Sequence, residues 1–241
     1  MWNVKIVTAY PEMFPGVLGH SIIGKALKEK KWSLNTIDLH KYGYDNRKSI
    51  DDCPFGGGPG MVIRSDVVEK AVMSAFRNTG KNMSLIYMTP GGKPLYQQDL
   101  TRFSKNDGVI ILCGRFEGVD ARVLDNLEFE RISIGDYVLA GGEVAAQVLV
   151  EGCVRLLPGV LGHSESFSEE SFSENLLEYP QYTRPQVWVD KKGIEHHVPD
   201  ILVSGHHEKI KEWRKNKSVE VTKKYRPDLL EKTEKAKKYN D

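Results

Sequence analysis

The sequence predicts an α/β fold with a mainly parallel sheet, followed by a smaller second domain. Short runs rich in β-branched residues alternate with segments of helical periodicity through the first two-thirds of the chain. Such alternation is typical of parallel strands joined by helical crossovers. Glycine clusters follow several of the expected strands, and ligands of open α/β sheets bind at the carboxyl ends of strands. Loops at that edge are therefore expected to form one pocket.

The expected elements follow one another in a simple order. Strands are predicted at residues 2–8, 32–39, 84–88, 109–113 and 129–134. Helices are predicted between and after them, with Ser65 as a candidate N-cap, at residues 21–30, 66–77, 97–103, 119–127 and 143–157. The 241 residues are enough to bury a core in one large domain or two modest ones.

Composition narrows the class of protein. Hydrophobic residues make up 40% and charged residues 28%, as in ordinary soluble globular proteins. No apolar run approaches the roughly 20 residues that span a bilayer, and residues 1–10 lack the layout of a signal peptide. We therefore expect a cytoplasmic protein without membrane contact. Three widely spaced cysteines predict buried free thiols, and the absence of HExxH or paired cysteine spacing predicts no metal site.

The chain changes character after the sheet domain, which we expect at residues 1–162. Residues 163–175 are rich in serine, phenylalanine and glutamate without lysine or arginine, so they predict a flexible linker or lid. Residues 176–241 predict a small, mostly helical domain with a hairpin near residues 190–193 and helices at residues 208–221 and 227–238. Residues 205–241 carry 12 lysines and arginines against 7 acids, whereas the preceding chain carries 22 against 26. Only this tail is suited to a polyanion.

Residues 132–143 predict a pocket lined by main-chain atoms. They read Ile-Ser-Ile-Gly-Asp-Tyr-Val-Leu-Ala-Gly-Gly-Glu, with three glycines where neither a helix nor a strand favours glycine. The apolar residues between the glycines supply a neutral wall. An uncharged, flat ligand such as adenine fits such a site. Glycine clusters at residues 89–92 and 113–118 are expected to join it.

Two common nucleotide motifs are excluded. Residues 19–25 have the GxxxxGK spacing of a phosphate loop, but Ala26 stands where a hydroxyl must reach magnesium. No GxGxxG follows a strand, so the dinucleotide fingerprint is missing too. The glycine-rich run at residues 51–61 is compatible with either a tight connection or a binding element.

Seven motifs in a fixed order resemble those of the bacterial tRNA (guanine-N(1))-methyltransferases, the TrmD family. The resemblance runs from about Val4 to Arg214. The motifs are Pro-Glu-Met-Phe at 11–14, Asp-Asp-x-Pro-Phe-Gly-Gly-Gly-Pro-Gly-Met at 51–61, Cys-Gly-Arg-Phe-Glu-Gly-Val-Asp at 113–120, Ser-Ile-Gly-Asp-Tyr-Val-Leu-Ala-Gly-Gly-Glu at 133–143, Arg-Leu-Leu-Pro-Gly-Val-Leu-Gly at 155–162, Tyr-Thr-Arg-Pro at 182–185 and Ser-Gly-His-His at 204–207. Each motif alone is weak, but their order is specific.

This resemblance implies a fold, a cofactor and an assembly. The fold is that of the SPOUT methyltransferases, with a deep C-terminal trefoil knot in the sheet domain, an exception to the rule against knots. The assembly is a homodimer with its active site at the subunit interface. The cofactor is S-adenosyl-L-methionine, bound in the knot. The implied cofactor-binding residues are Tyr87, Pro90, Gly91, Gly114, Glu117, Ser133, Ile134, Gly135, Tyr137, Leu139, Gly141 and Gly142.

The implied reaction methylates N1 of guanosine 37, which is 3′-adjacent to the tRNA anticodon. Because N1 carries a proton, a carboxylate base is needed, together with a cation for the charge that develops on O6. Arg155 matches the family arginine proposed for the second role. Glu170 stands where the family has an aspartate, and Glu169 remains a rival for the base. Mg²⁺ is a further cofactor suggested by the family, without a dedicated protein site.

The second domain is implied to grip the anticodon arm of tRNA. Candidate tRNA-binding residues in the whole chain are Asp51, Gly58, Arg184, His206 and Trp213. Trp213 is equally compatible with a core position in the small domain. Two other functions stay open: a non-enzymatic RNA-binding protein with a vestigial pocket, and another SPOUT RNA methyltransferase acting on ribose or on ribosomal RNA.

Overall fold

The computed structural model describes residues 1–77, 79–161, 170–172 and 174–231. The chain divides into two compact units, Met1–Gly162 and His163–Asp241. The first unit contains a five-stranded sheet in the order β2-β1-β6-β5-β7, with every pair of neighbours parallel. This confirms the predicted α/β fold with a mainly parallel sheet. The strands are β1 (Trp2–Thr8), β2 (Trp32–Asp38), β5 (Met83–Pro94), β6 (Gly108–Cys113) and β7 (Glu130–Ser133).

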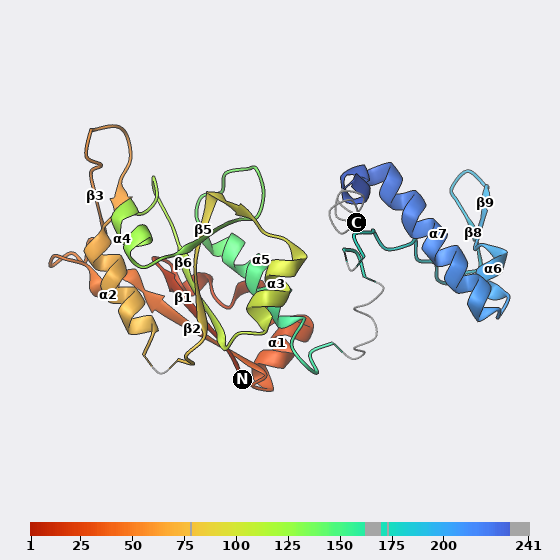
Figure 1. Cartoon of the computed structure of the whole chain (residues 1–241), viewed down its shortest axis with the longest axis horizontal. Coiled ribbons are helices and arrows are strands. Elements are labelled where there is room, and N and C mark those ends of the chain that lie inside the picture. Colours follow the sequence, from red (N-terminus) through yellow and green to blue (C-terminus); the bar gives the residue numbers. More distant parts are fainter. Residues whose placement is uncertain (78, 162–169, 173, 232–241) are drawn as a thin grey trace, which may run out of the picture. The chain divides into compact units, whose positions relative to one another are not determined.

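Helices cover both faces of this sheet. Figure 1 shows α1 (Ser21–Lys28), α3 (Gln97–Ser104) and α5 (Glu143–Val154) on one face, and α2 (Ser65–Ala75) and α4 (Ala121–Asn126) on the other. All six residues of β6 are buried, as expected of a central parallel strand with helices on both sides. The carboxyl ends of the strands remain open to loops, and these loops form the site described below.

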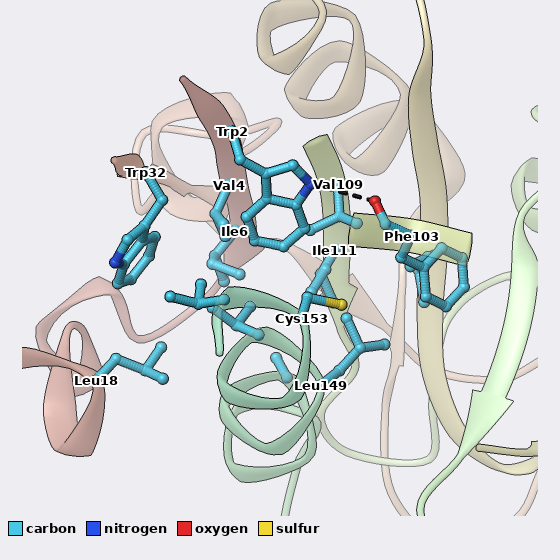
Figure 2. Close-up of a cluster of buried hydrophobic side chains, with 14 of the residues drawn as sticks. Trp2, Val4, Ile6, Leu18, Trp32, Phe103, Val109, Ile111, Leu149 and Cys153 are labelled. Atoms are coloured by element: carbon cyan, nitrogen blue, oxygen red, sulfur yellow. Dashed lines mark hydrogen bonds between the residues drawn. The ribbon is translucent and has the colours of Figure 1, made fainter. Parts of the chain in front are cut away.

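The two faces carry separate hydrophobic clusters. On the α5 face, Ile6 of β1 and Ile111 of β6 pack with Leu149 of α5 (Figure 2). The indole N–H of Trp2 donates to the carbonyl oxygen of Phe103 at 3.2 Å in the same cluster. A large aromatic ring is thereby buried without leaving its polar N–H group unsatisfied. Val67 of α2 belongs to the cluster on the opposite face.

Strand β5 is longer than predicted. The expected strand stopped at Met88, because the Thr-Pro-Gly-Gly sequence that follows is typical of a loop. The strand instead resumes after a bulge, since Met88 and Lys93 both pair with Ile132 of β7. A Cβ placed on Gly92 would collide with the backbone of Ile132. Glycine is therefore needed where β5 and β7 approach each other.

Smaller differences concern helix ends and short elements. Ser65 is the first residue of α2, and Arg64 occupies the N-cap without a side-chain capping bond, so the prediction of Ser65 as N-cap was wrong. The structure also contains a two-stranded antiparallel sheet of β3 (Asp51–Asp52) and β4 (Val62–Ile63). These strands are too short to show a periodic pattern in the sequence. Three 3₁₀ helices also appear, at Pro11–Met13 (η1), Gly16–Gly19 (η2) and Leu39–Tyr42 (η3).

The second unit has its own short elements. The predicted hairpin is present as β8 (Val187–Val189) and β9 (Glu195–His197), closed by the Asp190 N–H donating to the carbonyl of Ile194 at 2.9 Å. Helices α6 (Asp200–Val203) and α7 (His207–Tyr225) follow. The helix expected at residues 227–238 is present over 227–231, and the rest of it lies outside the described residues. Within the part of the chain that the structure describes, no helix is long and apolar enough to cross a bilayer.

Candidate functional site

A cavity of about 280 Å³ lies in the first unit where β6 and β7 end, beside the bulge of β5. Its wall comes from residues 87–90, residues 114–118 and residues 132–142, together with Ala145 of α5. These are the three glycine-containing clusters that the sequence singles out. The loops after β6 and β7 converge on one pocket as expected, whereas the third segment lies within β5, at its bulge, and not in a loop after the strand.

The structure brings nearly all predicted cofactor residues into this wall. Gly91 is the exception: it lies in the β5 bulge beside Pro90, and its N–H donates to the Thr89 hydroxyl at 3.3 Å. The predicted residues that line the cavity are Tyr87, Pro90, Gly114, Glu117, Ser133, Ile134, Gly135, Tyr137, Leu139, Gly141 and Gly142. Lining residues that were not among the predicted cofactor residues are Met88, Thr89, Arg115, Phe116, Gly118, Ile132, Val138, Ala140 and Ala145. Most of these residues lie between predicted ones in the sequence. Including every residue of each glycine cluster would therefore have found them.

Glycine is required where two main-chain segments meet behind the cavity. The Gly142 N–H donates to the carbonyl oxygen of Gly114 at 3.0 Å. A Cβ on Gly142 would lie 2.9 Å from the Cα of Cys113, closer than real packing allows. A Cβ on Gly114 would lie 2.8 Å from the Tyr87 hydroxyl oxygen. These glycines therefore permit the chain after β7 to dock against the end of β6.

The turn after β7 holds its own backbone in place. The Ser133 hydroxyl accepts from the Gly135 N–H at 3.2 Å and lies 3.0 Å from the Gly135 carbonyl oxygen, to which it can donate. Gly135 has a φ of 151°, a region that favours glycine. The Tyr137 hydroxyl donates to the Ile134 carbonyl at 3.1 Å. The cavity wall is thus shaped mainly by backbone and short local bonds.

A second turn presents Phe116 and Glu117. The Gly118 N–H donates to the Arg115 carbonyl at 3.0 Å, and Phe116 between them has a φ of 57°, which is uncommon for a bulky residue. The Glu117 N–H donates to the carbonyl of Met61 at 2.9 Å. The glycine-rich run at residues 51–61 therefore contacts this turn through Met61, although none of its residues lines the cavity.

The cavity wall combines exposed apolar side chains with neutral polar groups and two charged residues, Arg115 and Glu117. Val138 is 85% exposed and Tyr137 is 53% exposed, so these side chains offer apolar surface to a ligand. Burial raises the pKa of Tyr87, which keeps its phenol protonated. Burial, together with the nearby Glu143 carboxylate, raises the pKa of Cys113 well above that of a free thiol. Cys113 is therefore an inert buried thiol. Cys153 is buried as predicted, whereas Cys53 is exposed.

The two predicted catalytic residues belong to different units. Arg155 is half-buried and follows α5 directly as its C-cap, with φ and ψ still helical. Glu170 is half-buried in the second unit. Glu169, the rival base, lies outside the described residues.

The predicted tRNA-binding residues are also divided between the units. Asp51 begins β3, and Gly58 lies in an open loop where a Cβ would meet no atom within 4 Å. In the second unit Arg184 is exposed and His206 caps the start of α7. Trp213 of α7 is half-buried, 6.2 Å from the Tyr182 ring centroid, and both line a cavity of about 440 Å³.

No group of three or more histidine, cysteine, aspartate or glutamate side chains is placed to hold a metal ion among the residues that the structure describes.

Comparisons with known proteins place this geometry in a family. The family model described as tRNA (Guanine-1)-methyltransferase TrmD matches residues 2–232. A tRNA (guanine-N(1)-)-methyltransferase of Ruegeria sp. (strain TM1040) is 51% identical over 229 residues, covering 95% of this chain and 92% of the relative. The enzyme of the same name from Ehrlichia canis (strain Jake) is 50% identical, covering 95% of both chains. The chain belongs to the TrmD family of tRNA (guanine-1)-methyltransferases.

Proposed function

We propose that this protein transfers the methyl group of S-adenosyl-L-methionine to N1 of guanosine 37, 3′-adjacent to the tRNA anticodon. The observation that carries the proposal is the cavity where β6 and β7 end beside the β5 bulge, whose wall includes two motifs of the family resemblance, at residues 113–120 and 133–143. Its relatives are named for guanine-N(1) methyl transfer to tRNA. We therefore assign guanine-N(1) methyl transfer to this cavity.

The cavity fits an adenosyl group. Adenine is flat and uncharged, and the wall formed by residues 133–142 is apolar, with main-chain N–H and C=O groups beside it. Gly114 and Gly142 keep side chains out of the space where two backbone segments meet. Tyr137, Val138 and Leu139 supply exposed apolar surface for the ring. When bound, S-adenosyl-L-methionine supplies an electrophilic methyl group on a positively charged sulfur.

The remaining chemistry belongs to protein side chains. Guanine N1 carries a proton and becomes nucleophilic only as that proton leaves, so a carboxylate within hydrogen-bond reach is required. We assign this role to Glu170. Negative charge then develops on the guanine O6, and we assign its stabilisation to the Arg155 guanidinium, which can donate two parallel hydrogen bonds. Glu117 lies on the turn that lines the cavity. We place it near either the methionine part of the bound cofactor or the guanine of the substrate.

A trefoil knot accounts for how the chain leaves the sheet. Strand β7 lies at the sheet edge, next to β5 alone. The following residues return past β5 to dock on the end of β6, where Gly142 bonds Gly114, and α5 then packs beneath β1 and β6. This path supports the threading that defines SPOUT methyltransferases.

The proposed homodimer accounts for an exposed apolar face on α5. Val144 and Val148, one helical turn apart, are 50% and 48% exposed. Val17 of η2, which packs against α5, is 63% exposed. Exposed valines gathered on one face form an apolar patch of the kind that marks a protein–protein contact. A second copy of the chain would cover this face and complete the active site.

The second unit is assigned to tRNA binding. Helix α7 carries seven lysines and arginines against three glutamates, and neutralising phosphates is the main source of RNA affinity. Tyr182 and Trp213 offer aromatic surface in the same unit for stacking with unpaired bases. We expect the protein to work in the cytoplasm, where its proposed substrate is found.

The test is methyl transfer from labelled S-adenosyl-L-methionine to two unmodified tRNA transcripts, one with guanine and one with adenine at position 37. Transfer to the guanine transcript alone supports the proposal. Cofactor binding without transfer to either transcript would instead support the non-enzymatic RNA-binding alternative. Repeating the assay with and without Mg²⁺ tests the suggested metal requirement.

A further inference from the structure

A buried ion pair lies behind the cavity wall and has no part in the chemistry proposed above. Glu143, the first residue of α5, is 1% exposed, and its Oε2 lies 2.9 Å from Nη2 of Arg115. Its other oxygen, Oε1, accepts a hydrogen bond from the Thr8 hydroxyl at 2.7 Å. Both carboxylate oxygens are thus engaged by groups from other parts of the sheet domain.

Arg115 connects this carboxylate to the cavity. Its Nη1 donates to the carbonyl oxygen of Ala140 at 3.2 Å, and Ala140 lies in the glycine-rich wall. A Cβ placed on Gly141 would collide with the Arg115 side chain. Gly141 therefore makes room for the guanidinium, which explains this glycine without any ligand contact.

The same guanidinium contacts the Pro-Glu-Met-Phe motif at residues 11–14, a motif that the proposed reaction leaves without a role. It lies 4.5 Å above the ring centroid of Tyr10, and its Nη2 is 3.2 Å from the Met13 sulfur. Arg115 is therefore surrounded by a ring, a sulfur, a carboxylate and a carbonyl. Such a planar group with fixed donors holds its partners in one geometry, whereas lysine offers only a flexible point charge.

Stability alone is a weak reason for this arrangement. A buried ion pair is often no more stabilising than apolar residues of the same volume. What distinguishes this ion pair is that it fixes geometry. The carboxylate holds the guanidinium in one orientation, and the guanidinium in turn holds one carbonyl group of the cavity wall. A wall already held in its binding shape spares the ligand the cost of ordering it, so releasing the wall weakens binding.

We propose that Glu143 and Thr8 are positioning residues, which orient Arg115 so that it holds residues 139–142 in the shape that binds the cofactor. Neither of them is among the residues that line the described cavity. This inference rests on the proposed function, because it takes S-adenosyl-L-methionine to be the ligand. It goes beyond that function by assigning cofactor affinity to residues behind the wall.

The test uses three variants of the full-length protein: Glu143→Gln, Thr8→Val and the control Val150→Ala. Val150 is fully buried in α5 but belongs to the hydrophobic cluster, so its truncation lowers Tm without touching the ion pair. Calorimetry with S-adenosyl-L-homocysteine gives Kd, and methyl transfer at saturating donor gives kcat. We expect Glu143→Gln to raise Kd about 10- to 100-fold, Thr8→Val to raise it less, and kcat at saturation to change little in both.

A purely structural role predicts a different pattern. If Kd stays at the wild-type value in both Glu143→Gln and Thr8→Val, or if Val150→Ala weakens binding equally for the same loss of Tm, the inference is overturned. Should Glu143→Gln fail to fold, Thr8→Val decides alone: weaker binding supports the inference and unchanged binding overturns it. Absence of binding by the wild-type protein would instead contradict the proposed cofactor, so the two failures are distinguishable.

Discussion

The cavity wall and the second unit place functional residues in opposite ways. Around the cavity, buried strand ends and close backbone contacts hold each segment, as when Gly142 docks on Gly114 at 3.0 Å. In the second unit, every residue of β8 and β9 is exposed, and the buried residues of α7 are Ser218 and Thr222. A rigid, preformed pocket suits a small ligand of fixed shape. Exposed basic and aromatic side chains suit a large polyanion that orders them when it binds.

The largest expected effect is a loss of methyl transfer without loss of cofactor binding or tRNA binding. Glu170→Gln removes the proposed base and keeps its shape, so methyl transfer should fall about 10²- to 10⁴-fold, the usual contribution of general base catalysis. Cofactor Kd and tRNA affinity should be unchanged. Glu169→Gln is the matched control, with transfer measured at saturating substrates. A fully active Glu170→Gln protein would eliminate Glu170 as the base.

The next effect acts on the cavity alone. Gly142→Ala places a Cβ 2.9 Å from the Cα of Cys113, so the residues after β7 must shift, and cofactor Kd should rise about 10-fold or more. Affinity for tRNA should stay at the wild-type value if the two units act independently. Val150→Ala is the control, because it removes buried volume from the hydrophobic cluster away from this close approach. Equal cofactor Kd values for Gly142→Ala and the wild type would contradict the role given to this close approach.

The converse effect acts on the second unit alone. Lys211→Ala and Lys215→Ala each remove one exposed cation from α7. Each should weaken tRNA binding moderately and lower the slope of log affinity against log salt by about 1. Cofactor Kd should not change. Salt slopes that stay at the wild-type value would show that these lysines do not meet phosphates.

The smallest effect concerns the exposed hairpin. The backbone N–H of Ile194 and the His196 side chain hold the pKa of Asp190 below its ordinary value. Because a lowered pKa means that folding favours the carboxylate, its contribution is present above the unfolded pKa and disappears as the pH falls through the folded pKa. The indole N–H resonance of Trp188, which stacks on His196 at 5.0 Å, should report this loosening in acid. In Asp190→Asn the same resonance should lose that transition, and an unaltered acid transition would rule out Asp190 as its source.

Local patterns predicted more of the fold than of the contacts within the site. The alternation of strands and helices is a property of short segments, and β6 is the buried apolar strand that its sequence indicates. The continuation of β5 beyond Thr89-Pro90-Gly91-Gly92 depends on pairing with Ile132, which no local signal contains. Propensity alone therefore ended the strand too early.

In the site, too, local patterns were predictable and long-range contacts were not. Glycine clusters predicted a cavity lined by backbone, because glycine is informative wherever it interrupts an apolar run. Arg115 was missed, although it lies inside one of those clusters, because its contacts with Glu143 and with the Ala140 carbonyl join segments that are distant in sequence. Its partner Glu143 is itself bonded to Thr8, 135 residues away in sequence. A contact over that separation becomes visible only in the folded structure.

We propose that the cavity of the sheet domain serves methylation of one ring nitrogen in tRNA. Unmodified tRNA is to be reacted with a donor carrying a deuterated methyl group, and the labelled nucleoside identified by mass spectrometry after digestion. We expect a single labelled nucleoside, 1-methylguanosine, located 3′-adjacent to the anticodon. Label on a ribose hydroxyl, on another base, or at another position would eliminate the proposed function.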